Sequence, residues 1–201
     1  MNYSMRTTLR RLGWGLVFPL VDIHVGPIDV LPDLIGYLLI VSALRQLGAG
    51  YGVDKTAIWL AAILALLAVP RLLVNTSMNI DQYTTSPFAL HIYGQGVVIL
   101  HSLLAYRVFQ GLYANAITVA PPKLKDAIVN RRKFYMTVFA AQLFFYPFLL
   151  NLESGWVMLL MGLQLCFILA ELLLIRLPFR LSRIRIAPPI GDRDNAAAEL
   201  L

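Results

Sequence analysis

An acid and an imidazole stand two residues apart in the first apolar stretch of the chain, as Asp22 and His24 within Gly13–Val25. Such a pair can pass a proton between its members, and each group is costly in an apolar environment unless it is paired, protonated or hydrated. Two interpretations stay open. The residues form a structural Asp–His contact, or they belong to a path for protons or ions.

Further polar side chains interrupt three later apolar stretches. They are Gln95 and His101 in one stretch, Gln142 in the next and Gln164 in the last. At 1.5 Å of rise per helical residue, counting from the ends of each stretch places them near a common central layer. They either hydrogen-bond neighbouring helices, at about 0.6 kcal/mol each, or line the same path.

The segment Gly26–Leu38 contains Pro27 and Pro32, which exclude one continuous straight helix because proline fixes φ and lacks an N–H donor. The apolar arms on either side are therefore predicted to form a helical hairpin, which either reaches the far surface or is re-entrant. Asp33 is placed to cap the helix that follows, and Asp29 to cap the turn. Both acids are also candidates for a substrate or ion site, by analogy with the broken helices of transporters.

The same segment reads GPIDVLPDLIGYL. Its core, from Pro27 to Asp33, resembles the Pro-Ile-Asp-Leu-Ile-Pro-Asp segment of the YkvA-like bacterial proteins, and the whole phrase is similar to one in uncharacterised small multi-pass bacterial membrane proteins. Leu39 and Ile40 stand where an acidic pair follows in the YkvA-like pattern. The resemblance implies no activity.

Two further charged residues lie near the ends of apolar stretches. Arg71 is expected to snorkel outward or to form an ion pair with an acid on the same side. Its candidate partners are Asp29, Asp33, Asp81 and Glu153. Glu171 stands five residues before Arg176 and is expected to snorkel toward the inner surface.

The apolar composition predicts the fold class. Only 14% of the residues are charged, whereas a soluble domain carries about 25%. Four stretches are long enough for a helix to cross a hydrocarbon core, which takes about 20 residues. They are Thr56–Val74, Phe88–Val108, Phe134–Leu152 and Trp156–Ile175. With the hairpin over residues 13–47, the sequence predicts an all-α polytopic membrane helix bundle of six segments, in a single domain over residues 1–186.

Basic residues predict the orientation of this bundle. Of the 17 Lys and Arg residues, 16 fall on one side of the predicted bilayer, all except Arg71. Positively charged loops stay in the cytoplasm, so both termini are expected on the inner side of a bacterial cytoplasmic membrane. Six segments, unlike five, keep Arg6, Arg10 and Arg11 on that side.

Two basic segments are expected on the inner leaflet. Residues 120–133 are predicted to form a short amphipathic piece at the surface, with Leu124 and Ile128 on one face. Near the C-terminus, four arginines alternate with apolar residues and are expected to contact anionic lipid headgroups. They are Arg176, Arg180, Arg183 and Arg185. Residues 187–201 are predicted to be a disordered cytoplasmic tail.

Several kinds of chemistry find no support in the sequence. No cofactor or metal site is predicted, because the only cysteine, Cys166, reads as a small packed hydrophobe and because His91 and His101 are too far apart along one helix to share a metal. Ser102 follows His101, but neighbours on a helix point about 100° apart, which disfavours a hydrolase. The positive charge is assigned to topology and not to a nucleic-acid partner.

Two functional classes remain. The first is a transporter or channel-like protein, whose path is formed by the hairpin and the central polar layer. The second is an accessory or scaffold membrane protein, whose polar residues only join helices. A smooth face of Ala57, Ala61, Ala65 and Ala68 suits packing within the chain, against a second copy or against a partner membrane protein. An intramembrane enzyme is disfavoured.

Overall fold

The computed structural model describes residues 3–21, 24–25, 28–29, 33–51, 54–73, 87–119, 121–149 and 157–184. The prediction of an all-α fold is confirmed. The helices are α1 (Tyr3–Val17), α2 (Asp33–Tyr51), α3 (Lys55–Leu73), α4 (Phe88–Val119), α5 (Pro122–Leu149) and α6 (Val157–Arg183). A short 3-10 turn, η1 (Phe18–Leu20), extends α1. Between α1 and α2, the two-residue strands β1 (His24–Val25) and β2 (Ile28–Asp29) pair antiparallel.

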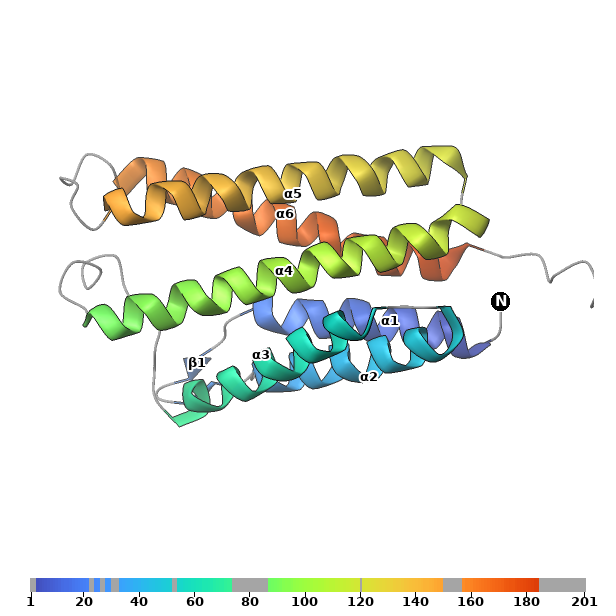
Figure 1. Ribbon diagram of the computed structural model, residues 1–201, viewed down its shortest axis with the longest axis horizontal. Coiled ribbons are helices and arrows are strands. Elements are labelled where there is room, and N and C mark those ends of the chain that lie inside the picture. The colour runs from blue at the N-terminus through green and yellow to red at the C-terminus, as the bar shows by residue number, and fades with distance from the viewer. Residues whose placement is uncertain are drawn as a thin grey trace, which may run out of the picture.

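The helices form a closed ring of neighbours that alternate in direction (Figure 1). Each helix packs against the next along the chain, and α6 closes the ring by packing against α1. α4 and α6 also touch across the ring. As a result, α1 begins and α6 ends at the same end of the bundle, on the right in Figure 1.

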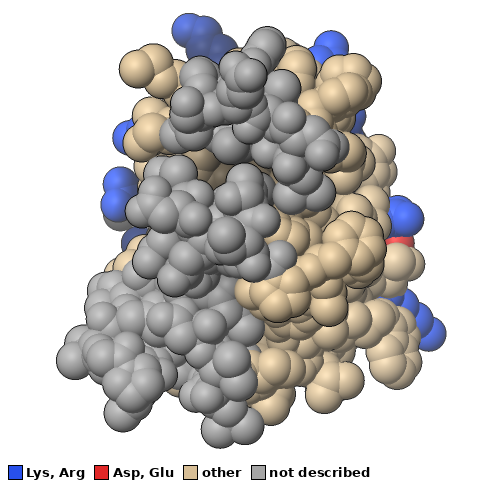
Figure 2. Space-filling view, turned by 90° about the vertical axis from the view of Figure 1, so that its left-hand side faces the viewer, with Lys and Arg blue, Asp and Glu red and all other residues tan. Residues whose placement is uncertain are grey.

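We call this end the basic end, because the lysine and arginine residues of the six helices lie toward it, from Arg6 of α1 to Arg183 of α6, with the exception of Arg71 near the end of α3. α2 and α4 end there, and α3 and α5 begin there. Figure 2 looks onto the opposite end, where the described surface facing the viewer is uncharged and the basic residues appear only at the margins. Positive charge therefore differs between the two ends of the bundle, and not between one side of the ring and another.

Small residues allow the first three helices to approach closely. A Cβ atom on Gly15 of α1 would lie 3.0 Å from the carbonyl oxygen of Gly36 of α2, so a side chain at this crossing would collide with backbone. The alanine face of α3 is buried, with Ala57 and Ala61 both 0% exposed. The face predicted from the sequence thus packs within the chain.

Large apolar side chains cover the outside of the ring. Every helix exposes at least one of them: Trp14, Leu38, Trp59, Phe88, Phe144 and Met158. A soluble protein rarely exposes so much apolar surface. Two helical stretches are long and apolar enough to cross a membrane by length and composition, Phe88–Ala114 in α4 and Met161–Arg183 in α6. These two helices point to a membrane protein.

Several helix boundaries differ from the predicted ones. α1 begins at Tyr3 and not at Gly13, because a buried stripe at helical spacing extends the helix backward past the arginines. The stripe consists of Met5, Leu9, Leu12 and Leu16. α5 runs without interruption from Pro122, so the amphipathic piece predicted over residues 120–133 is the first part of a long helix. Leu124 and Ile128 are buried and continue the inward face of α5.

Candidate functional site

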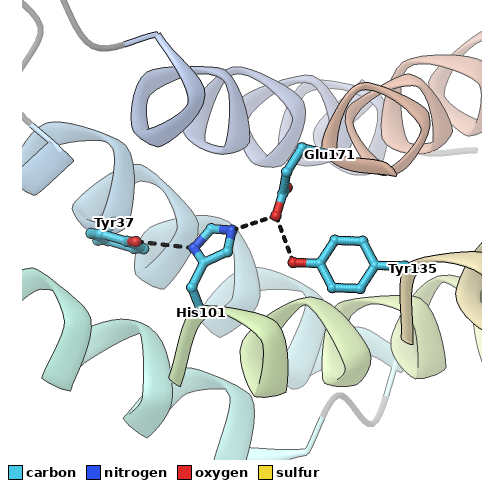
Figure 3. Close-up of polar contacts among 4 residues, drawn as sticks. All are labelled: Tyr37, His101, Tyr135 and Glu171. Carbon is cyan, nitrogen blue, oxygen red and sulfur yellow. Dashed lines mark hydrogen bonds and ion pairs between the residues drawn. The ribbon is translucent and has the colours of Figure 1, made fainter. Parts of the chain in front are cut away.

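Four polar side chains from four helices meet inside the ring (Figure 3). Nδ1 of His101, on α4, lies 3.0 Å from the hydroxyl oxygen of Tyr37 on α2. Nε2 of His101 lies 3.1 Å from Oε1 of Glu171 on α6. The hydroxyl of Tyr135, on α5, donates to the same Oε1 at 2.5 Å. We call these four residues the His–Glu network.

The His–Glu network is far from both ends of the bundle. His101, Tyr135 and Glu171 each stand near the middle of a helix of 27 to 32 residues. The side chains of His101 and Glu171 are 12% and 5% exposed, and Tyr135 is fully buried. A carboxylate in such surroundings is costly unless it is paired and hydrogen-bonded, and here it has both an imidazole and a phenol.

The network can hold a proton in more than one place. With Glu171 ionised, Nε2 of His101 donates to the carboxylate. With the proton on Glu171, the carboxyl donates to Nε2, and Nδ1 then carries the hydrogen that it donates to Tyr37. The hydroxyl of Tyr37 can accept or donate and so accommodates both tautomers. With a neutral imidazole the first of these states carries a net charge of −1, and the second holds one proton more, so binding that proton brings the pair to zero without moving a heavy atom.

A second group of polar residues lies on α4 and α5, toward the end opposite the basic end. Nδ1 of His91 is 2.8 Å from the hydroxyl oxygen of Tyr146, and both side chains are buried. Gln95 and Gln142 each bury an amide oxygen that has no hydrogen-bond partner among the described residues. The buried hydroxyl of Ser102 also lacks a partner of good geometry there, although it lies near that of Tyr135.

The structure brings together only part of the predicted site. His101 joins the His–Glu network, and Gln95 and Gln142 lie on two of the helices that build it. Gln164 is exposed on α6 and does not take part. Asp33 is buried as the first residue of α2, the position at which it was expected to begin a helix.

The proposed Asp22–His24 pair stays a prediction. Asp22 lies outside the described residues, and for His24 and Asp29 only the backbone is described, where the two are partners in the β1–β2 register. Arg71 belongs to α3, but its side chain is not among those described. The ion pair expected for Arg71 is therefore untested.

The expectation that Glu171 snorkels to the inner surface is wrong, because it is 3% exposed inside the ring. The apolar stretch that contains Glu171 ends at Ile175, but α6 continues to Arg183, so Glu171 lies deeper than the end of that stretch indicates. A signal was present: Leu174, Leu177 and Leu181 follow Glu171 at helical spacing and are buried with it. Cys166 is exposed and not packed, so that expectation is also wrong.

The two tyrosines of the His–Glu network were not predicted from the sequence. Tyr37 lies inside the hairpin segment and Tyr135 at the start of an apolar stretch, two places where tyrosine commonly marks a membrane interface. Only the observed helix packing shows that both hydroxyls point inward (Figure 3). No local pattern distinguishes such a tyrosine from an interfacial one.

A basic pocket lies at the basic end, between the start of α5 and the end of α6. Its volume is about 230 Å³, and it is lined by Pro121, Lys123, Leu124, Arg180 and Ile184. Arg176, Arg180 and Arg183 are exposed on α6 as predicted for headgroup contact, and Arg185 lies outside the described residues. Arg131 of α5 reaches α6 as well, because its Nη1 donates to the carbonyl oxygen of Leu173 at 3.1 Å.

Within the described residues, no three His, Cys, Asp or Glu side chains come together as metal ligands. Comparison with family models, with curated proteins and with solved structures finds no match for this chain. The case for a function therefore rests on the geometry of the His–Glu network and of its surroundings.

Proposed function

We propose that this chain is a multi-pass membrane protein with six membrane segments, in which the His–Glu network is the proton-binding site of a transporter. Three observations support this topology. The six helices alternate in direction, all expose large apolar side chains, and carry their basic residues toward one end, except for Arg71 of α3. By the positive-inside rule, the basic end faces the cytoplasm. The resemblance of the hairpin segment favours a bacterial cytoplasmic membrane.

The observation that carries the function is the contact between His101 and Glu171 in the middle of the ring. Ionisable side chains at membrane depth are rare, and they commonly mark the path of a proton or an ion. A carboxylate shared by an imidazole and a phenol can bind and release a proton while its neighbours keep their places. Coupling that event to the movement of a solute is the mechanism of a proton-driven transporter.

Proton binding is tested on the protein in liposomes. Infrared difference spectra between acidic and alkaline buffer should contain a carboxyl band that Glu171→Gln lacks. Tyr135→Phe, which removes one hydrogen bond but keeps the titrating pair, should retain the band at a shifted position. A Glu171→Gln protein that folds and keeps the band would refute the assignment.

Transport is tested with the same proteins. Charge movement on a solid-supported membrane is recorded while amino acids, sugars and organic ions are added in turn. The wild-type chain should give a proton-dependent current with one of these classes, and Glu171→Gln should give none. A current of equal size in Glu171→Gln would show that transport does not depend on the His–Glu network.

One observation favours the accessory or scaffold class as a second candidate. The half of α6 farther from the basic end exposes Met158, Met161, Gln164 and Leu165, and Gly162 there has open space around it. Lipid cannot satisfy the amide of Gln164, so a second copy of this chain is the fitting partner. Oxidation in liposomes should cross-link two copies through Cys166, and Cys166→Ser is the control. A chain that stays monomeric would remove this candidate.

The basic pocket adds a lipid partner. Lys123 and Arg180 present cations beside the apolar side chains of Leu124 and Ile184, which suits a phosphate headgroup with the start of its acyl chains. On the cytoplasmic side such headgroups belong to anionic lipids, which attract basic residues at about 1 kcal/mol each.

A further inference from the structure

Four cations lie along the contact between α5 and α6, in and beside the basic pocket. Lys123 and Arg180 line the pocket itself. Arg131 stands about two turns farther along α5, and Arg176 stands about one turn back along α6. The charges of Arg180 and Arg176 both act on Arg131, so the cations extend beyond the pocket as one group. We call these four residues the basic seam.

No acid pairs with the basic seam within the described part of the chain. Asp126, which is close to it along α5, is exposed and forms no ion pair there. Arg107, at the same end of the bundle, does have such a partner in Asp54. In the basic seam, Arg131 donates to the carbonyl oxygen of Leu173, and the other three cations are exposed. Because like charges at short range repel each other, the basic seam suits a ligand that brings negative charge.

The exposed face of α6 continues from the basic seam as an apolar surface. Leu172 and Leu169 stand four and seven residues before Arg176, which places them on the same face of the helix. They are 45% and 50% exposed. Phe134 of α5, three residues after Arg131, is exposed as well. A soluble phosphate compound would make no use of these side chains, whereas the acyl chains of a lipid would lie along them.

The basic seam is longer than one phosphate group. Arg176 and Arg180 are separated by four residues, or about 6 Å along the helix. Each has another cation of α5 within its reach, Arg131 for Arg176 and Lys123 for Arg180. Arginine forms paired hydrogen bonds with phosphate oxygens, so each of these two positions can hold one phosphate. Two phosphates that are joined through one glycerol would occupy both positions at once.

We propose that the basic seam binds a phospholipid with two phosphate groups joined through one glycerol. One phosphate lies in the basic pocket between Lys123 and Arg180, the other lies between Arg131 and Arg176, and acyl chains follow Leu172 toward the middle of the membrane. This inference rests on the lipid partner of the proposed function and names its class. It does not depend on proton binding by the His–Glu network.

Lipid binding is measured by native mass spectrometry of the full chain. The diphosphate phospholipid and phosphatidylglycerol, which has one phosphate, are added at equal phosphate concentration. The wild-type chain should bind the diphosphate lipid at least about fivefold more tightly, because further cations contact it. Arg176→Gln, at an exposed position, should lower the affinity for the diphosphate lipid by about fivefold, the contribution of one basic residue. It should leave the affinity for phosphatidylglycerol nearly unchanged, whereas Lys123→Gln should lower both affinities.

Arg6→Gln is the matched control, because it removes the same charge from an exposed position on α1. An equal loss in Arg6→Gln and Arg176→Gln would overturn the proposal in favour of net charge. Equal affinity of the wild-type chain for the two lipids would refute the second phosphate position and leave the lipid partner of the proposed function in place. Failure to bind either lipid would refute that partner as well.

The source of the phosphates is tested with the deacylated headgroup, a soluble glycerol compound with the same two phosphates. It should compete with the diphosphate lipid only weakly, because it lacks the chains that would contact Leu169 and Leu172. Competition at the same concentration as the intact lipid would show that the basic seam binds a soluble phosphate compound, and would overturn the proposal.

Discussion

The two sides of the ring are packed by different kinds of side chain. α1, α2 and α3 approach closely at glycine and alanine, namely at Gly15, Gly36 and the buried face of α3. α1 and α2 are also joined by two side-chain hydrogen bonds, from Thr8 to Gln46 and from Arg11 to Ser42. α4, α5 and α6 meet through contacts of histidine, tyrosine and glutamate. On this second side, Gly94, Gly96 and Gly162 have open space around them.

The interface of small residues supports the fold, and the polar interface holds the groups that can do chemistry. Small residues bring backbones into contact and have no polar side-chain groups to satisfy, so such an interface has one close-packed arrangement. A polar interface can exchange protons and water, but it needs a rigid neighbour to hold its geometry. Tyr37 links the two sides at the His–Glu network, because it stands on α2 one residue after Gly36 and reaches His101.

The largest effect is expected from a methyl group at the glycine crossing. In Gly36→Ala the new Cβ would lie 2.7 Å from Cβ of Phe18 and 2.9 Å from the carbonyl oxygen of Gly15, so backbone must move. We expect a loss of about 1–3 kcal/mol in the free energy of unfolding, with a weaker contact between Tyr37 and His101. Unfolding of the detergent-solubilised protein with heat measures the first effect.

Gly162→Ala is the matched control for this prediction. No atom lies within 4 Å of a Cβ at this position, and alanine is a better helix former than glycine by about 1 kcal/mol. Its stability should equal or exceed that of the wild type. If the two variants lost stability equally, the contrast between the two sides would be wrong.

How much of this arrangement the sequence predicts depends on the side considered. The alanine face of α3 is predictable from the sequence, because small residues repeated at helical spacing indicate a close contact between helices. The central polar layer is predictable in part, because Gln95, His101 and Gln142 interrupt apolar stretches. The helical class followed from the same stretches, because only helices satisfy a long apolar backbone segment internally.

The partner of His101 was not predictable from local patterns. Glu171 lies in a stretch whose apolar character fades before its helix ends, so a count of depth misplaced it. The closure of the ring is also not predictable from local patterns, because the contact of α6 with α1 joins residues more than a hundred positions apart. The meeting of four helices at one carboxylate is a property of that closure, and no spacing along the chain records it.

An intermediate effect is expected at the basic pocket, which belongs to the α5–α6 side. Lys123→Gln with Arg180→Gln should weaken binding to vesicles of anionic lipid by roughly the 1 kcal/mol that each basic residue contributes. Arg6→Gln with Arg45→Gln removes the same charge from exposed positions on α1 and α2. Lys123 and Arg180 are exposed as well, so the pocket that they line is what distinguishes the two pairs of cations. If the pocket holds a headgroup, the pocket variant should lose more binding than the control variant in a flotation assay. Equal losses in both variants would mean that charge alone matters and that the pocket adds nothing.

The smallest effect is expected where the two sides are joined at the surface. Asp54, just before α3, accepts from the backbone N–H and the hydroxyl of Thr56, at 3.0 and 2.9 Å, and pairs with Arg107 of α4 at 3.2 Å. The hydrogen bonds from Thr56, the backbone one first, lower the pKa of Asp54, and Arg107 lowers it further. A lowered pKa in the folded state means that the carboxylate stabilises the fold above its unfolded pKa, and that this contribution disappears as the pH falls through the folded value. Asp54→Ala should therefore melt slightly below the wild type at neutral pH, and the two curves should merge in acid, below the ordinary aspartate value of 3.8. Because the pair is exposed to solvent, the neutral-pH difference should also shrink with added salt. A difference that persists in acid would show that Asp54 acts through packing and not through its charge.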